Sequence, residues 1–173
     1  MVKIIAALVA LLTASSAQAD WQFTKWGMSE SELKSLSANI IQTTAAESND
    51  HSNPSVGRAL YKSGYRASDV DFAAYFWFNA GRLVAVELTP RNITQDGPKV
   101  NITLGQIYGA PIEDKSRSMV GGNMFCNVID RKWRSEREAN VITAYGMTCN
   151  KGNTKDIFNV RYTPILSSGS SGL

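Results

Sequence analysis

Hydrophobic positions in this chain follow helical spacing in two places, and each helical run is followed by segments that alternate between apolar and polar residues. The first helical run holds Leu33, Leu36 and Ile40, directly after an S-x-x-E capping box that begins at Ser29. In such a box, the serine hydroxyl accepts a hydrogen bond from the third helical amide, and the glutamate carboxylate accepts one from the serine amide. The spacing and the cap together predict a helix over about residues 30–44.

A polar segment at residues 47–58 follows. It carries Pro54 and Gly57, which predict a loop. His51 is the only histidine of the chain, so no second imidazole lies near it, and no G-x-S-x-G elbow is present for it to serve. We therefore expect His51 to be exposed and without a catalytic role.

Alternation in the first half predicts strands. Over residues 70–78, phenylalanine and other apolar positions alternate with Asp71, Tyr75 and Trp77. We expect the phenylalanine side to face the core, and Tyr75 and Trp77 to point the other way. A short turn that contains glycine then joins this strand to residues 83–89 as a hairpin. Shorter strands are predicted at residues 21–26 and 59–65.

The second half repeats this order. Val100, Leu104 and Tyr108 lie at helical spacing and predict a helix over residues 100–108, which Gly109 can end. A loop is predicted at residues 113–123, and strands are predicted at residues 124–134, 140–149 and 157–163.

The two cysteines support the pairing of two of these strands. If the chain turns at residues 135–139, Cys126 and Cys149 lie about equally far from the turn and come opposite each other. An even pair of cysteines in an exported chain is typical of a disulfide. We therefore predict a disulfide that joins two adjacent strands.

The order of elements predicts an α+β fold, with an antiparallel sheet and short helices on one face. Residues 20–166 form the expected domain. Two helix-plus-three-strand repeats, at residues 20–90 and 98–166, are one hypothesis, and a single irregular domain is the other. Residues 167–173 are low in complexity and predict a flexible tail.

The N-terminal sequence predicts where the protein is located. A short positive segment precedes an unbroken apolar run at residues 4–12, and an A-x-A site ends at Ala19. This order predicts a signal peptide over residues 1–19, cleaved after Ala19. The apolar run is too short to anchor the chain in a bilayer, and no cysteine directly follows the cleavage site. We expect a periplasmic or secreted protein with no stable membrane anchor.

The composition of the chain limits the classes of partner that we expect it to bind. Hydrophobic residues make up 43% of the chain, which is enough to form a core, and the formal net charge is +3. Nucleic-acid binding would call for a clustered basic stripe. The basic residues at 131–137 are interrupted by Glu136, so we expect no nucleic-acid partner.

The usual catalytic patterns are missing from the sequence. There is no G-x-S-x-G elbow, no phosphate-binding glycine loop and no metal-ligand spacing, so we expect no enzyme, no metal and no cofactor. The carboxylates of Asp69, Asp71 and Glu87 lie on or beside neighbouring predicted strands. They leave a small envelope hydrolase or a glycan-binding protein as the alternative function.

Aromatic side chains indicate a function more directly than these carboxylates do. Tyr75, Trp77, Trp133 and Tyr145 all fall on predicted strands. If helices cover one face of the sheet, alternation leaves some of these rings on the open face, where tyrosine and tryptophan are typical of protein-binding hot spots. We expect an envelope or secreted protein as the partner, and replacement of Trp77 by alanine to weaken its capture without much loss of stability.

Several short segments resemble exported bacterial proteins. W-G-M-S at residues 26–29, running into a capped helix, resembles the opening of many small exported proteins, and L-G-Q-I-Y-G-A-P at 104–111 is similar to an element of the BamE-like envelope family. Trp133, the strand of Ile142 and V-R-Y at 160–162 resemble the sheet ending of that family. Two helix-plus-sheet units also resemble the β-lactamase inhibitory protein fold. The resemblance implies an exported α+β protein that binds a partner on its sheet, and it carries over no functional residue.

Overall fold

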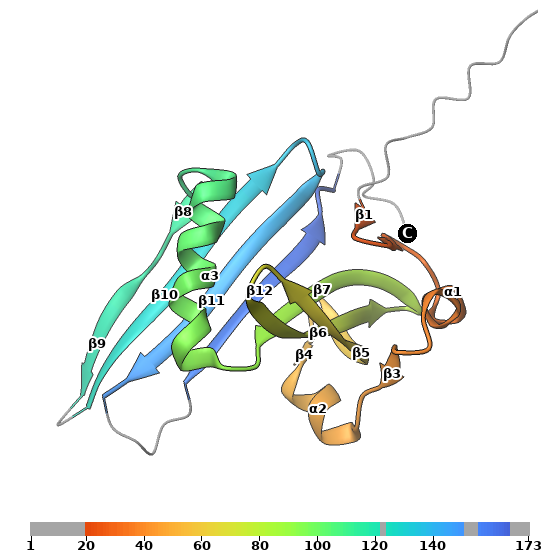
Figure 1. The fold of residues 1–173 in the computed structure, drawn as a ribbon, viewed down its shortest axis with the longest axis horizontal. Helices are drawn as coiled ribbons and strands as arrows, with labels where there is room; N and C mark the ends of the chain where they lie inside the picture. The colour runs from red at the N-terminus through yellow and green to blue at the C-terminus, as the bar shows by residue number, and fades with distance from the viewer. Residues whose placement is uncertain (1–19, 122–123, 151–155, 167–173) are drawn as a thin grey trace, which may run out of the picture.

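One ten-stranded antiparallel sheet organises the molecule (Figure 1). The computed structural model describes residues 20–121, 124–150 and 156–166. The predicted signal peptide at 1–19 and the predicted tail at 167–173 lie outside these residues. The long strands are β5 (Gly57–Ala67), β6 (Val70–Asn79), β7 (Arg82–Pro90), β10 (Met124–Ser135), β11 (Asn140–Cys149) and β12 (Ile157–Pro164). The predicted α+β class with an antiparallel sheet is confirmed.

Short strands and three helices complete the fold. The short strands are β1 (Asp20–Trp21), β2 (Thr24–Lys25), β3 (Ile41–Gln42), β4 (Ser52–Asn53), β8 (Glu113–Asp114) and β9 (Arg117–Gly121). The helices are α1 (Glu30–Leu36), α2 (Ala45–Asp50) and α3 (Ile93–Tyr108). Strands β1 and β2 form a separate two-stranded hairpin, where the sequence predicted one strand at residues 21–26. Within the described residues, no helix is long and apolar enough to cross a membrane.

Two three-stranded meanders meet at the centre of the sheet. The order in space is β5-β6-β7 and then β12-β11-β10, so β7 pairs with β12. Val160 lies opposite Leu88, and Arg161 lies opposite Glu87. We call this β7–β12 junction the seam. The helix before the first meander, α1, has 7 residues and α3 has 16, and the proposed duplication stays a prediction.

The main core lies between α3 and one face of the sheet. Val100 and Leu104 of α3 pack in one apolar cluster with Leu88, Phe158 and Val160. Figure 1 shows α3 lying across the β10–β12 half of the sheet. The N-terminal segment, with Trp21, Trp26 and Leu33, joins the same cluster from the other half.

A smaller cluster covers the opposite face, and it corrects the prediction that the helices lie on one face. Ala59, Trp77 and Ala85 are buried there with Val56 packed against them. The chain segment that begins with α2 reaches this face, because His51 just after α2 contacts Glu87. The α2 segment is therefore on the side of the sheet away from α3.

Local element boundaries differ from the sequence predictions in several places. The helix predicted to reach residue 44 ends at Leu36, and a second capping box at Thr44 starts α2, which runs into the predicted loop at 47–58. Helix α3 begins at Ile93, seven residues earlier than predicted, with Pro98 inside it. The predicted loop at 113–123 instead contributes β8 and β9, both paired with β10.

The predicted disulfide is confirmed. Cys126 and Cys149 are bonded, with 4.1 Å between their Cα atoms. They lie directly opposite each other in the β10–β11 register, which continues to Ser135 opposite Asn140 at the turn. Equal distance from the turn was therefore a sound guide to pairing, because antiparallel register is fixed by the turn that joins the strands.

Candidate functional site

The four aromatic residues expected to bind a partner do not form one exposed patch. Trp77 and Trp133 are each 1% exposed, and Tyr75 and Tyr145 are half-buried. Trp133 also lies on the α3 side, where its indole N–H donates to the Gly109 carbonyl at 2.9 Å. Trp77 lies in the cluster on the opposite face. Both indoles are core residues, so truncation of Trp77 is expected to cost stability, contrary to the sequence-based expectation.

The three carboxylates of the alternative reading also separate. Asp69 is exposed and lies 3.8 Å from the Lys99 ammonium, and Asp71 is exposed and pairs with Arg66 at 3.3 Å. Glu87 is buried, and its carboxylate contacts neither of them. A pair of carboxylates around one substrate bond is therefore not formed by these residues.

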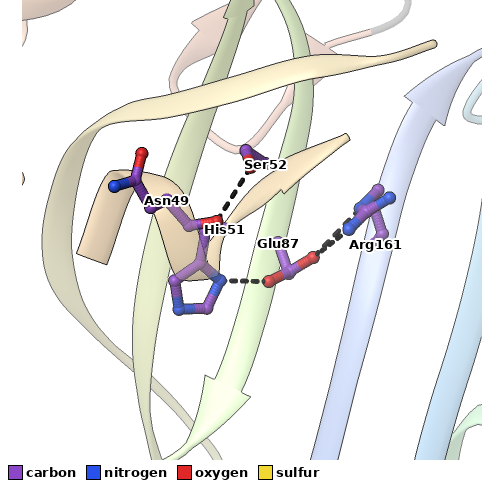
Figure 2. Close-up of polar contacts among 5 residues, drawn as sticks. All are labelled: Asn49, His51, Ser52, Glu87 and Arg161. Carbon is purple, nitrogen blue, oxygen red and sulfur yellow. Dashed lines mark hydrogen bonds and ion pairs between the residues drawn. The ribbon is translucent and has the colours of Figure 1, made fainter. Parts of the chain in front are cut away.

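Glu87 instead bridges His51 and Arg161 across the sheet (Figure 2). One carboxylate oxygen lies 2.6 Å from His51 Nδ1. The other accepts from Arg161 Nε at 3.0 Å and Nη2 at 2.5 Å. The Glu87 side chain is 2% exposed, so these contacts compensate the cost of burying its charge. We call His51, Glu87 and Arg161 the Glu87 cluster.

Aromatic rings support both arms of the Glu87 cluster. The His51 ring stacks on Tyr75 with 3.7 Å between centroids, and the Arg161 guanidinium lies 4.0 Å from the Trp77 ring centre. In the register of the sheet, Tyr75 lies opposite Glu87, and Glu87 lies opposite Arg161. Opposite residues share a face, so β6, β7 and β12 present these side chains together.

His51 was expected to be exposed and unpaired, and this was wrong. A hydrogen bond from the Ala59 amide to its carbonyl fixes its backbone. The Ser52 hydroxyl donates to the Asn49 carbonyl at 2.8 Å and tightens the end of α2 (Figure 2). The imidazole partner is 36 positions away in the sequence, so no local pattern reveals it.

The Glu87 cluster fastens the α2 segment to the seam. Both Glu87 oxygens are occupied, and within the described residues no serine, threonine or lysine side chain bonds to the His51 ring. A histidine needs such a nucleophile within hydrogen-bond reach for covalent catalysis. The described residues also hold no group of three or more His, Cys, Asp or Glu placed to bind a metal ion.

A cavity of about 430 Å³ lies on the other face of the sheet, beneath α3. We call it the seam cavity, because Leu88 of β7 and Val160 of β12 line it where the two meanders join. Val100 and Leu104 line it from α3, and Trp21 lines it from the N-terminal segment. Its volume is within the range of small-molecule sites.

The seam cavity exists because two different elements cover the two halves of one face. Helix α3 packs over the second meander, and the N-terminal segment packs over the first through the Trp21 ring. That ring lies 5.3 Å from Tyr65 and 6.3 Å from Tyr162, centroid to centroid. Neither cover fills the space between them, above the seam.

Polar side chains form a substantial part of the seam-cavity lining, and most of them are paired. The Gln22 amide donates to the Tyr65 hydroxyl at 3.1 Å, and the Tyr108 hydroxyl donates to Glu138 at 3.0 Å. Asn140 accepts from the Trp26 indole at 3.0 Å. A lining that combines apolar walls with placed polar groups is typical of ligand sites.

The hydroxyl groups of Tyr108 and Tyr162 lie in surroundings that disfavour a negative charge. Burial is the largest cause raising the pKa of the Tyr162 hydroxyl to about 12, and burial likewise raises the pKa of Tyr108. Both rings line the seam cavity. Desolvation raises a phenol pKa because it penalises the phenolate, so both hydroxyls stay protonated at neutral pH.

No sequence signal marked the seam cavity, because its lining comes from segments spread between Trp21 and Tyr162.

Comparison with protein-family models, with curated proteins and with solved structures found no match for this chain. The chemistry of the site therefore rests on its own geometry.

Proposed function

We propose that this chain is an exported, non-enzymatic binding protein whose small-molecule ligand occupies the seam cavity. The observation that carries the proposal is the cavity itself, which is walled by aromatic and aliphatic side chains between α3 and the seam. The largest well-formed apolar pocket with a few convergent polar groups is the default position of a ligand.

Export is supported by two independent features. The Cys126–Cys149 disulfide is typical of proteins that fold in an oxidising compartment. The sequence before Asp20 has the order of charge, apolar run and small residues that is typical of a signal peptide. A periplasmic or secreted location accounts for both.

A fluorescent probe tests occupancy of the seam cavity. N-phenyl-1-naphthylamine is uncharged and brightens in apolar surroundings, and we expect saturable binding to the wild-type protein. Val100→Trp places an indole in the cavity wall and should weaken binding at least tenfold. Ile102→Trp is the matched control, because Ile102 is on the same helix but 61% exposed and outside the lining.

Three outcomes decide the test. Loss of probe binding in Val100→Trp alone, with a melting temperature close to that of the wild type, supports the proposal. Equal binding by Val100→Trp and the wild type would place the probe elsewhere and contradict it. Absence of saturable binding to the wild type would contradict it as well. If Val100→Trp fails to fold, Thr103→Trp at the cavity wall takes its place.

A partner protein is the second candidate, at a different place from the one the sequence suggested. Val120 on β9 lies opposite Phe125 on β10, and the two are 77% and 39% exposed. Exposed apolar pairs of this kind favour contact with another protein. Met119 and Met124 on the same hairpin are also exposed.

The partner candidate is tested by crosslinking to the envelope fraction of the source cell, read by mass spectrometry. We expect one protein to be enriched by the wild type and by Ile102→Ser, and lost with Phe125→Ser. Equal enrichment by Phe125→Ser would remove the hairpin as the binding surface.

A further inference from the structure

We propose that the seam cavity selects an uncharged ligand that has an apolar body and one hydrogen-bond acceptor at its end. A long-chain alcohol is the simplest member of this class. The inference rests on the proposed function and names the chemistry of its ligand.

The walls supply an apolar environment around the body of the ligand. Aliphatic side chains of Leu88, Val100 and Val160 form the floor and the helix side, and the rings of Trp21 and Phe72 form the other side. All five are at most 9% exposed. An alkyl chain or a flat ring that enters this space loses contact with water and gains dispersion contacts on several sides.

The charged groups at the edge of the cavity are ion-paired. The Lys99 ammonium is shared by Asp96 at 3.1 Å and Asp69 at 3.8 Å. The Lys99 and Asp69 side chains are about half exposed or more, so water screens them. The carboxylate of Glu138 accepts from Tyr108 at 3.0 Å and from Arg137 at 2.9 Å. Each charged side chain of the lining therefore has an opposite charge within 4 Å.

A charged ligand would lose hydration against the buried walls of this cavity, which are apolar. Burial raises the pKa of Tyr162 to about 12, which means that the same surroundings already penalise a negative charge on a phenol. Transfer of an ion into an apolar site is strongly unfavourable unless a counter-charge is present. An uncharged molecule avoids this cost.

Tyr65 is the group that can recognise the polar end. Its hydroxyl accepts from Gln22, and within the described residues its own proton is used in no hydrogen bond. A hydroxyl donor can satisfy one acceptor oxygen of the ligand while it keeps the Gln22 contact. The remaining hydroxyl of the helix wall, Thr103, donates to the Lys99 carbonyl at 2.9 Å.

Displacement of N-phenyl-1-naphthylamine by a matched twelve-carbon series tests the charge preference. At pH 7, 1-dodecanol is uncharged, dodecanoate is an anion and dodecylamine is a cation, and the chain is the same in all three. We expect 1-dodecanol to displace the probe at least tenfold more tightly than either ion, at concentrations below micelle formation.

The outcomes separate this inference from the proposed function. If an ion displaces the probe as well as 1-dodecanol does, the uncharged class is wrong while the binding function stands. If maltose displaces the probe and 1-dodecanol does not, the site is a sugar site and the inference is overturned. If the probe itself does not bind in the seam cavity, both proposals fail.

Tyr65→Phe tests the polar end. It should weaken 1-dodecanol roughly two- to tenfold, the value of one hydrogen bond, and leave the affinity for N-phenyl-1-naphthylamine unchanged. Tyr75→Phe is the control, because Tyr75 lies on the opposite face. An equal loss for both ligands would show that Tyr65 only shapes the wall, and no loss would remove it as the recognising group.

Discussion

Glu87 is the buried residue that links the α2 segment to the sheet. Its buried carboxylate satisfies His51 on one side and Arg161 on the other, and each of these rests on an aromatic ring. A buried charge with two partners contributes little on balance, but its removal leaves two partly buried partners uncompensated.

Glu87→Gln should therefore destabilise the protein strongly. We expect a loss of about 3 kcal/mol in the free energy of unfolding, because the amide keeps the shape but leaves the Arg161 charge without a counter-charge. Urea denaturation at pH 7 measures it. Asp71→Asn is the control: it breaks an exposed pair and should cost less than about 1 kcal/mol. Equal losses would show that the Glu87 cluster is no more than a surface contact.

Single residues also show what the sequence can predict. The Ser29 capping box and the cysteine pair were predicted, because each depends on residues at fixed local spacing or on a turn between them. The pairing of His51 with Glu87 and the burial of Trp77 were not, because both depend on which distant segment lies on a sheet face.

At the scale of elements, α3 shows how tertiary packing overrides local signals. The helical spacing of Val100, Leu104 and Tyr108 marked only the later part of this helix, yet α3 starts at Ile93. A Cβ atom added to Gly97 would lie 3.2 Å from the Phe158 ring, and one added to Gly146 would lie 2.7 Å from it. The ring is held between the two glycines, so glycine at 97 lets the helix approach the sheet.

Replacement of the two helix glycines should have opposite effects. Gly97→Ala is expected to destabilise by about 1–3 kcal/mol, since Phe158 cannot move away from the new methyl group. Gly105→Ala, with no atom near the added Cβ, should stabilise by up to about 1 kcal/mol through helix propensity. Thermal unfolding measures both. Stabilisation by both would mean that the α3–β12 contact is loose.

The α2 segment should respond to acid. The Lys62 ammonium and the Thr44 backbone amide lower the Glu47 pKa from 4.5 to about 2. A lowered folded-state pKa means that the contact stabilises the fold above the ordinary glutamate pKa and is lost as the pH falls toward 2. We expect an NMR titration midpoint for Glu47 near pH 2.

Lys62→Met is the matched variant for this titration. It removes the largest cause of the lowered pKa and should bring the Glu47 midpoint back toward its ordinary value. A wild-type midpoint at the ordinary glutamate value would show that the Lys62 contact does not persist in solution.

At the scale of the whole molecule, the sheet is one continuous layer whose two faces serve different roles. The Glu87 cluster closes one face, and the seam cavity lies on the other, with the β7–β12 pairing between them. The alternating pattern was enough to predict the six long strands and their class. It could not predict the seam or its cavity, because β7 and β12 are separated by most of the second half of the chain.

The Cys126–Cys149 disulfide should stabilise the folded protein. Reduction of Cys126–Cys149 releases a closed loop with a separation of 23 residues, and we expect a loss of about 3 kcal/mol. Thermal unfolding with and without dithiothreitol measures this. An unchanged melting temperature, with two thiols titrating in the native protein, would contradict the expectation.

The most direct test of the central claim is an NMR titration of the methyl groups with 1-dodecanol. Binding in the seam cavity predicts saturable shifts at Leu88, Val100 and Val160, which line the two sides of the seam, and no change at the exposed Val120. Shifts confined to Val120, or no saturable shift at any lining methyl, would contradict a ligand site beneath α3.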